Sequence, residues 1–212
     1  MRAPLATPTW AGVAGLSYGV IMLFVLTLRH LSVPEAPTTV DWTLNPSGLR
    51  AAGIATTLLP FAGIAFLWFI GVLRSELGDR EDKFFATVMM GSGLLYVAMT
   101  FMSGATSGAL LLLVNSGYPG TDHTLGALQT LTMEIAGTYG ARMAAVFVLS
   151  VTTIGRKAQI MSKPIVVIGY IVALALIFAP PLTRWMQLLF PLWVMLLSVM
   201  VLIRARKRPG QV

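Results

Sequence analysis

Residues 84–114 read FFATVMMGSGLLYVAMTFMSGATSGALLLLV, a run of 31 residues without Asp, Glu, Lys or Arg. A helix needs about 20 apolar residues to cross a hydrocarbon core of about 30 Å. The run exceeds that length, and it therefore predicts a membrane-spanning helix.

Five more segments of the same kind flank this run. Four of them also lack charged residues: 10–28, 51–73, 164–183 and 185–203. The fifth, residues 124–154, is just as apolar apart from Glu134 and Arg142. The sequence predicts an all-α, polytopic membrane protein, a six-helix transmembrane bundle. We expect a single transmembrane domain, residues 1–212, with helices at approximately 10–29, 49–73, 82–114, 124–155, 163–180 and 184–204.

Composition supports an integral membrane protein. Hydrophobic residues make up 56% of the chain and charged residues 11%, whereas a soluble domain has roughly 25% charged residues. The chain contains no cysteine, which excludes disulfides, thiolate metal sites and cysteine nucleophiles. The first apolar run is longer than the core of a signal peptide, so we expect it to be retained as a span.

The basic residues predict the orientation. With a cytoplasmic N-terminus, eleven of them lie on the inner side and three, Arg29, Arg50 and Arg184, on the outer side. This distribution follows the positive-inside rule and predicts a multi-pass protein of a cell membrane with cytoplasmic N- and C-termini. We interpret the basic residues at 204–208 as a topology anchor that meets anionic lipid head groups, and we expect no nucleic-acid partner.

Several segments predict irregular or close-packed helices. Residues 84–114 and 124–154 are longer than a span requires, so these helices must tilt, project or break, and the small residues at 103–108 favour a break there. Pro60 and Pro191 predict kinks in their helices. Two GxxxG pairs, Gly15 with Gly19 and Gly104 with Gly108, predict close helix packing, most simply within one chain.

The two charges in segment 124–154 belong to a polar stripe. Thr130, Glu134, Thr138 and Arg142 recur at intervals of four residues, which places them on one helical face. An arginine at the bilayer centre costs from about 2.5 to over 10 kcal/mol, depending on the method. We therefore expect this face to point into the bundle.

Three interpretations of the stripe remain open. Arg142 is satisfied by backbone carbonyls or by a phenolic oxygen such as that of Tyr96, and then only fixes the helix in place. Alternatively, Glu134, Arg142, Thr138, Thr130 and Tyr96 bind a charged ligand in a polar pocket that opens outward. The third interpretation is contact with a partner subunit.

Motifs for enzymes and cofactors are absent from the sequence. It contains no GxSxG, HExxH, P-loop or Rossmann pattern. Both histidines, His30 and His123, fall on the expected outer side, so we expect no haem, metal or other cofactor. No catalytic residue is predicted, and Glu134 is the one candidate acid or base for an intramembrane enzyme.

Three stretches carry a resemblance: residues 71–88 (GVLRSELGDREDKFFATV), 141–157 (ARMAAVFVLSVTTIGRK) and 190–194 (FPLWV). They resemble a group of uncharacterised bacterial six-helix integral membrane proteins. The resemblance implies a location in a bacterial plasma membrane and a family of unknown function, and it assigns no catalytic or binding residue to this chain.

The sequence therefore leads to two functional hypotheses. The first is non-enzymatic binding or transport of a small charged or amphiphilic molecule through the outward-facing polar pocket. The alternative is an accessory or assembly subunit of a larger membrane protein complex, with another membrane protein or a second copy of the chain as partner.

Overall fold

The computed structural model describes residues 8–32, 45–77, 83–116, 122–178 and 184–206, and within these ranges the protein is all α-helical. The elements are α1 (Pro8–Ser32), α2 (Pro46–Leu77), α3 (Lys83–Asn115), α4 (Asp122–Met133), the π-helix η3 (Glu134–Gly140), α5 (Ala141–Lys157), α6 (Lys163–Phe178), the 3₁₀-helix η4 (Arg184–Leu188) and α7 (Leu189–Arg206). Because α4, η3 and α5 are continuous and η4 leads directly into α7, the described residues form six helices, as predicted.

Five of these helices are long and apolar enough to cross a membrane, which makes the chain a multi-pass membrane protein. The helix expected at 163–180 is the exception, since α6 is apolar but has 16 residues in the part of the chain that is described. Its expected continuation to residue 180 lies outside the described residues. Six helices are thus confirmed, and five of them are candidate spans.

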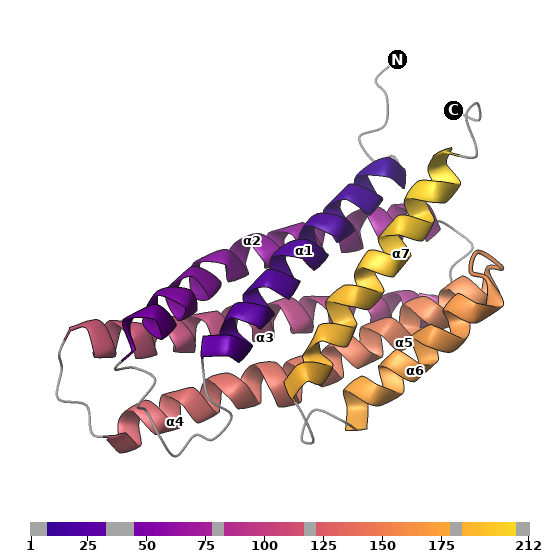
Figure 1. Ribbon diagram of the computed structural model, residues 1–212. Coiled ribbons are helices and arrows are strands. Elements are labelled where there is room, and N and C mark those ends of the chain that lie inside the picture. Colours follow the sequence, from indigo (N-terminus) through magenta and orange to yellow (C-terminus); the bar gives the residue numbers. More distant parts are fainter. Residues whose placement is uncertain (1–7, 33–44, 78–82, 117–121, 179–183, 207–212) are drawn as a thin grey trace.

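The helices form a bundle in which most sequence neighbours are also spatial neighbours (Figure 1). Helix α1 packs between α2 and α7, α3 packs between α2 and α5, and α6 packs mainly on α5. A smaller contact between α6 and α7 closes the ring. The start of α1 and the end of α7 lie at the same end of the bundle, and we call the opposite end, where α1 finishes, the Arg29 end.

Buried aromatic rings fill the centre of the ring of helices. Phe66 of α2 lies 4.7 Å from Tyr18, 5.3 Å from Tyr96, 5.2 Å from Phe147 and 5.4 Å from Phe190, measured between ring centroids. Most of these pairs meet edge to face, an arrangement that stabilises aromatic contacts beyond their buried area. One aromatic core thus joins α1, α2, α3, α5 and α7.

Glycines let α1 approach α7 closely. A Cβ atom added to Gly15 would lie 2.0 Å from Ser198 Oγ, and one added to Gly19 would lie 2.1 Å from Met195 Cγ. Such distances leave no room for a side chain. The prediction that the Gly15–Gly19 pair serves packing within one chain is therefore confirmed.

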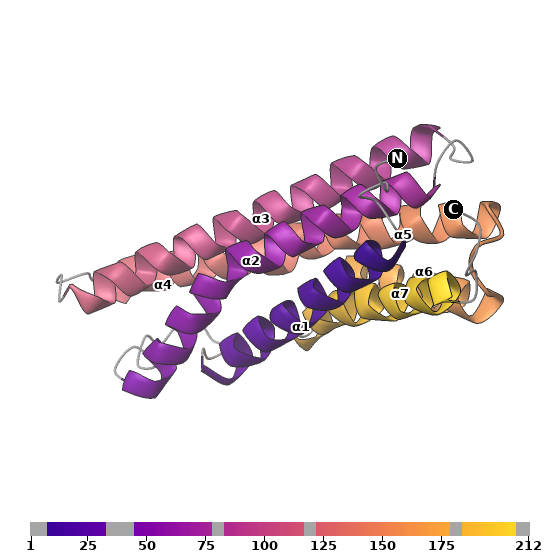
Figure 2. The ribbon, with the colours of Figure 1, turned by 90° about the horizontal axis from the view of Figure 1, so that it is seen from above.

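The expected break at residues 103–108 is wrong, because α3 is helical without interruption from Lys83 to Asn115. The small residues serve packing instead. A Cβ atom on Gly104 would lie 3.2 Å from Leu59 Cδ1, and one on Gly108 would lie 3.8 Å from Thr56 Cγ2. The helix accommodates its length by projecting: at the Arg29 end, α3 and α4 extend beyond α1 (Figures 1 and 2).

The two prolines behave differently. Helix α2 continues through Pro60 and bends away from α3 toward its N-terminal end (Figure 2), as expected when a proline removes a backbone hydrogen bond. Pro191 lies in the first turn of α7, which follows the 3₁₀ segment η4. Proline is tolerated in a first turn because its missing N–H has no partner there. The helix predicted at 184–204 therefore begins as a tighter coil.

Candidate functional site

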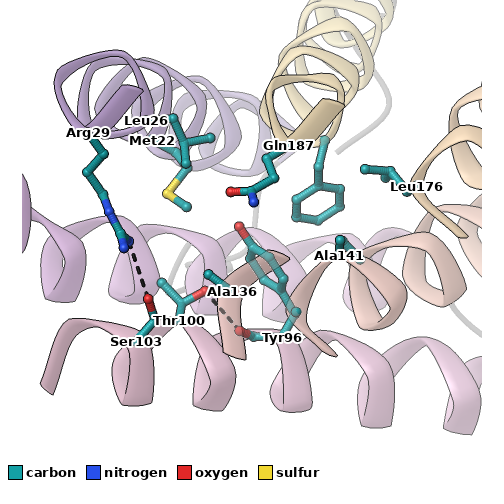
Figure 3. A pocket seen from close by; sticks show the side chains of 13 residues that line it. Met22, Leu26, Arg29, Tyr96, Thr100, Ser103, Ala136, Ala141, Leu176 and Gln187 are labelled. Atoms are coloured by element: carbon teal, nitrogen blue, oxygen red, sulfur yellow. Dashed lines mark hydrogen bonds between the residues drawn. The ribbon is translucent and has the colours of Figure 1, made fainter. Parts of the chain in front are cut away.

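A small cavity lies inside the bundle near its Arg29 end (Figure 3). Its volume is approximately 30 Å³, and because one water molecule needs roughly 10–15 Å³ on this measure, it holds about two water molecules or one small anion. The lining residues come from α1, α3, η3, α5, α6, η4 and α7: Met22, Leu26, Arg29, Tyr96, Thr100, Ser103, Ala136, Gly140, Ala141, Ala144, Leu176, Gln187 and Phe190.

Helical periodicity brings the lining residues of α1 and α3 together. Met22, Leu26 and Arg29 follow one another at intervals of four and three residues, and so do Tyr96, Thr100 and Ser103. Such spacing places three side chains on one face of a helix. Each helix therefore presents one apolar or aromatic end and one polar end to the cavity, with the polar ends together at the Arg29 end.

The opposite wall is the π-helix η3. The N–H of Ala141 donates to the carbonyl of Ala136, five residues earlier, which is the hydrogen-bond pattern of a π-helix. Ala136, Gly140 and Ala141 line the cavity with small or absent side chains. Gly137 leaves space for Gln187, since a Cβ atom there would lie 3.0 Å from Gln187 Nε2. The π turn and its small residues thus create the room that the cavity occupies.

A series of hydrogen bonds joins three helices at the Arg29 end of the cavity. Arg29 Nη1 donates to Ser103 Oγ over 3.3 Å, and Ser103 Oγ donates to the carbonyl oxygen of Thr132 over 3.2 Å. Thr132 Oγ1 lies 2.8 Å from Thr106 Oγ1 and donates to it. These bonds fix α1, α3 and α4 at a common level. Because Arg29 directly follows the apolar run 10–28, this level marks the end of the apolar part of α1.

A buried tyrosine, Tyr96, lines the cavity, and a second tyrosine, Tyr18, lies next to it in the aromatic core. The hydroxyls of Tyr18 and Tyr96 lie 2.7 Å apart and share a hydrogen bond. Tyr18 is almost completely buried in the aromatic core, whereas Tyr96 also lines the cavity. Thr100 donates to the Tyr96 carbonyl over 2.9 Å, and Figure 3 shows Tyr96 and Gln187 pointing into the cavity. The cavity is therefore polar on the side of α3 and η4 and apolar toward α6.

Of the five residues predicted to bind a ligand, Tyr96 alone lines this cavity. Thr130 and Glu134 are exposed, and Thr138 and Arg142 are partly exposed. The expectation that the stripe points into the bundle is therefore wrong. Buried residues of α4, η3 and α5, including Thr132, Ile135 and Ala144, occupy the inward face instead. Whether the stripe binds a ligand stays a prediction.

Arg142 obtains a local hydrogen-bond partner in the π turn. Its Nη1 donates to the backbone carbonyl oxygen of Thr138 over 2.7 Å. Helical side chains lean toward the N-terminus of the helix, which brings the guanidinium to a carbonyl four residues earlier. This agrees with the interpretation in which a backbone carbonyl accepts a hydrogen bond from Arg142, and the accepting carbonyl belongs to the π-helix η3.

Sequence reasoning missed Arg29, Thr100, Ser103 and Gln187. Arg29 follows an apolar run and was assigned to topology, and Ser103 was assigned to a break. The spacing of Met22, Leu26 and Arg29 is the one signal that places Arg29 on a defined face of its helix. Nothing in the sequence shows that Gln187 meets Gly137, because the contact joins two separate helices.

Both histidines are in helices. His30 Nδ1 lies 2.6 Å from the Leu26 carbonyl oxygen, and its ring lies 4.6 Å from the ring of Trp185. His123 is exposed in the first turn of α4. The described residues contain no group of three or more His, Asp or Glu side chains arranged to hold a metal ion.

Comparisons of the chain with models of protein families, with curated proteins and with solved structures find no match. No family is identified. The resemblance to uncharacterised six-helix membrane proteins therefore stays a prediction, and the function is argued from the site alone.

Proposed function

We propose that the protein binds or transports a small anionic molecule, or the anionic end of a larger amphiphile, in the cavity between α1, α3 and η3. The observation that supports this most is the presence of the Arg29 guanidinium among the residues that line a cavity inside the bundle. This proposal keeps the class of function predicted from the sequence and moves the pocket to the opposite face of the helix.

The chemistry of the lining favours an anion. Among the described residues that line the cavity, Arg29 alone carries a charge. Gln187 adds an amide with two N–H donors, and Tyr96 adds a hydroxyl. A guanidinium with neutral donors nearby is the arrangement that recognises carboxylates and other anions. The apolar side formed by Leu176 and Phe190 suits a short hydrocarbon group beside the charge.

The size of the cavity limits the ligand. About 30 Å³ accommodates a chloride or the head of a formate ion, and a larger molecule requires η4 and α1 to separate. The π-helix η3 forms one wall of the cavity, and π turns often occur at functional sites. Arg29 is partly exposed, so the entrance that we propose is at its end of the bundle.

The test measures binding of defined probes to the purified full-length chain in detergent micelles. Chloride, formate, acetate and octanoate are compared with gluconate at constant ionic strength, and the Tm is followed by tryptophan fluorescence. We expect chloride and formate to raise the Tm, since a ligand that binds only the folded state stabilises it by about 2.7 kcal/mol at 100 times its Kd. A larger effect of octanoate indicates an amphiphile.

Arg29→Gln is the decisive variant, and Arg50→Gln is its matched control. Arg50 is exposed in the first turns of α2, at the same end of the bundle, and it does not line the cavity. We expect Arg29→Gln to abolish the shift and Arg50→Gln to keep it. Equal shifts in wild type and Arg29→Gln for every probe contradict the proposal.

The basic residues also support an orientation with both termini in the cytoplasm. Reporter fusions after residues 206 and 116 test this proposal. We expect cytoplasmic reporter activity for the first and activity on the opposite side for the second. The reverse pattern contradicts the orientation.

A second candidate function is that of an accessory or assembly subunit. The observation that favours it is the outward direction of Glu134 and Arg142, which leaves two charged side chains on a face of the bundle that no described helix covers.

A further inference from the structure

We propose that the outward face of α4, η3 and α5 binds a membrane-spanning helix of a different protein, and that this helix presents a carboxylate to Arg142. We call this face the polar stripe and define it by Thr130, Glu134, Thr138 and Arg142. The inference does not depend on the anion-binding cavity, which lies on the opposite face of the same segment.

The burial pattern defines the stripe as a surface. Thr130 and Glu134 are exposed, and Thr138 and Arg142 are partly exposed. Apolar side chains flank them, including Tyr139, which is 60% exposed, and Leu149, which is 39% exposed. Lipid chains suit the exposed apolar side chains on either side of the stripe, but they do not suit its charged side chains. A surface of this kind is typical of one that another helix covers.

The hydrogen-bonded layer of Arg29, Ser103 and Thr132 fixes the depth of the stripe. That layer lies where the apolar part of α1 ends. Arg142 follows Thr132 by ten residues, which at about 1.5 Å per residue is up to ~15 Å further along the helix, and slightly less in the π turn. Since the hydrocarbon core is about 30 Å thick, Arg142 lies near its middle.

At that depth, the guanidinium of Arg142 can donate further hydrogen bonds. Its hydrogen bond within the described residues, to the Thr138 carbonyl, takes one of the five N–H groups of a guanidinium. Charged residues inside membranes are costly and pair with one another or line water. A carboxylate is the group that accepts two parallel hydrogen bonds from a guanidinium. An acidic residue on a neighbouring helix is therefore the partner that this site fits.

A second copy of the chain fits less well. Two copies with the same orientation, related by an axis along the membrane normal, bring equal depths together, so Arg142 meets Arg142 and Glu134 meets Glu134. An inverted copy pairs Glu134 with Arg142, but the eleven basic residues on one side against three on the other oppose insertion in both directions. The occupant is therefore a different chain.

The test places a photo-crosslinking amino acid at Thr138 in the full-length chain, in its native membrane. A matched position, Ile171 of α6, is 60% exposed and lies outside the stripe. We expect a discrete adduct from position 138 and none from 171, and we expect mass spectrometry to identify a chain with an Asp or Glu in a membrane-spanning helix. Arg142→Leu should lower the adduct yield at least tenfold.

Two further measurements separate docking from a folding defect. Purified Arg142→Leu, and Arg142→Gln as the more conservative variant, should keep the Tm of the wild type in micelles. Arg142→Glu combined with an arginine at the identified acidic residue of the partner should restore the adduct. The proposal is overturned by an adduct between two copies of this chain, by lipid adducts alone, by an adduct that Arg142→Leu leaves unchanged, or by failure of the charge exchange.

Discussion

The two faces of the segment α4–η3–α5 contrast with each other. Its inward face carries small and apolar residues, including Ala144, Ala145 and Phe147, and it borders a cavity whose one charged lining residue within the described chain comes from α1. Its outward face carries both of its mid-helix charges, Glu134 and Arg142. In a water-soluble protein, outward charges need no explanation, but on an apolar membrane-spanning helix they do.

The contrast teaches that polarity alone does not locate the interior of a membrane protein. Close packing decides which face turns inward, because a bundle without a hydrophobic driving force between its helices depends on van der Waals contact between small residues. The alanines and glycines of η3 and α5 satisfy this requirement, and a face with a long charged side chain does not. Each prediction below pairs an inward or buried position with a matched position elsewhere.

The largest expected effect concerns Phe147, which is completely buried, against Leu149, which is 39% exposed on the same helix. Phe147→Ala removes a ring that contacts Phe66 and Phe190 and should lower the free energy of unfolding by about 3–5 kcal/mol. Leu149→Ala should stay within about 0.5 kcal/mol. Reversible unfolding in mixed SDS micelles measures both. Similar losses for the two variants would show that the faces are packed alike.

An intermediate effect concerns Tyr18 and Tyr96, which share a hydrogen bond and of which Tyr96 lines the cavity. Tyr96→Phe leaves the Tyr18 hydroxyl unpaired in a sealed core and should cost about 1–3 kcal/mol of unfolding free energy. Tyr18→Phe should cost less, under about 1 kcal/mol, because the Tyr96 hydroxyl can bond to water in the cavity. The same unfolding assay ranks them, and the opposite order contradicts a hydrated cavity.

The smallest expected change in the free energy of unfolding concerns two glycines, Gly91 and Gly137. Gly91 has open space around the position of a Cβ atom, so Gly91→Ala should raise the free energy of unfolding by about 0.5–1 kcal/mol. In Gly137→Ala the same gain in the free energy of unfolding is offset, because the added methyl group would lie 3.0 Å from Gln187 Nε2 and displace that side chain. We expect Gly137→Ala to change stability little and to reduce the Tm shift caused by formate.

An equal gain for both alanine variants, with an unchanged effect of formate, argues against a role for Gln187 in the cavity. Fluorescence-detected melting with and without formate provides the measurement, and Gly91→Ala with formate is the control.

Much of the fold followed from the pattern of apolar residues. The long uncharged runs predicted six helices within a few residues of their observed ends, and the Gly15–Gly19 pair predicted close packing that α1 makes with α7. The same logic failed at residues 103–108, where small residues suggested a break. Small residues permit either a break or a close approach, and the presence of α2 beside them selected the approach.

The candidate site was less predictable. An interval of four residues placed Thr130, Glu134, Thr138 and Arg142 on one face, and the structure does place them on the outward side. Which direction that face takes depends on neighbours that the interval does not contain. The π turn also changes the helical period within the stripe, and no residue in EIAGTYG signals a π-helix by its type alone.

The sequence by itself determined that this protein is helical and crosses a membrane, because hydropathy and helix length are properties of single segments. It also determined which residues carry charge within segment 124–154. The tertiary structure decided which face of that segment is buried and where the cavity forms. It also decided that Arg29 and Gln187 both line this cavity. These features arise from contacts between separate helices, and their free energies depend on shape complementarity that no single helix encodes.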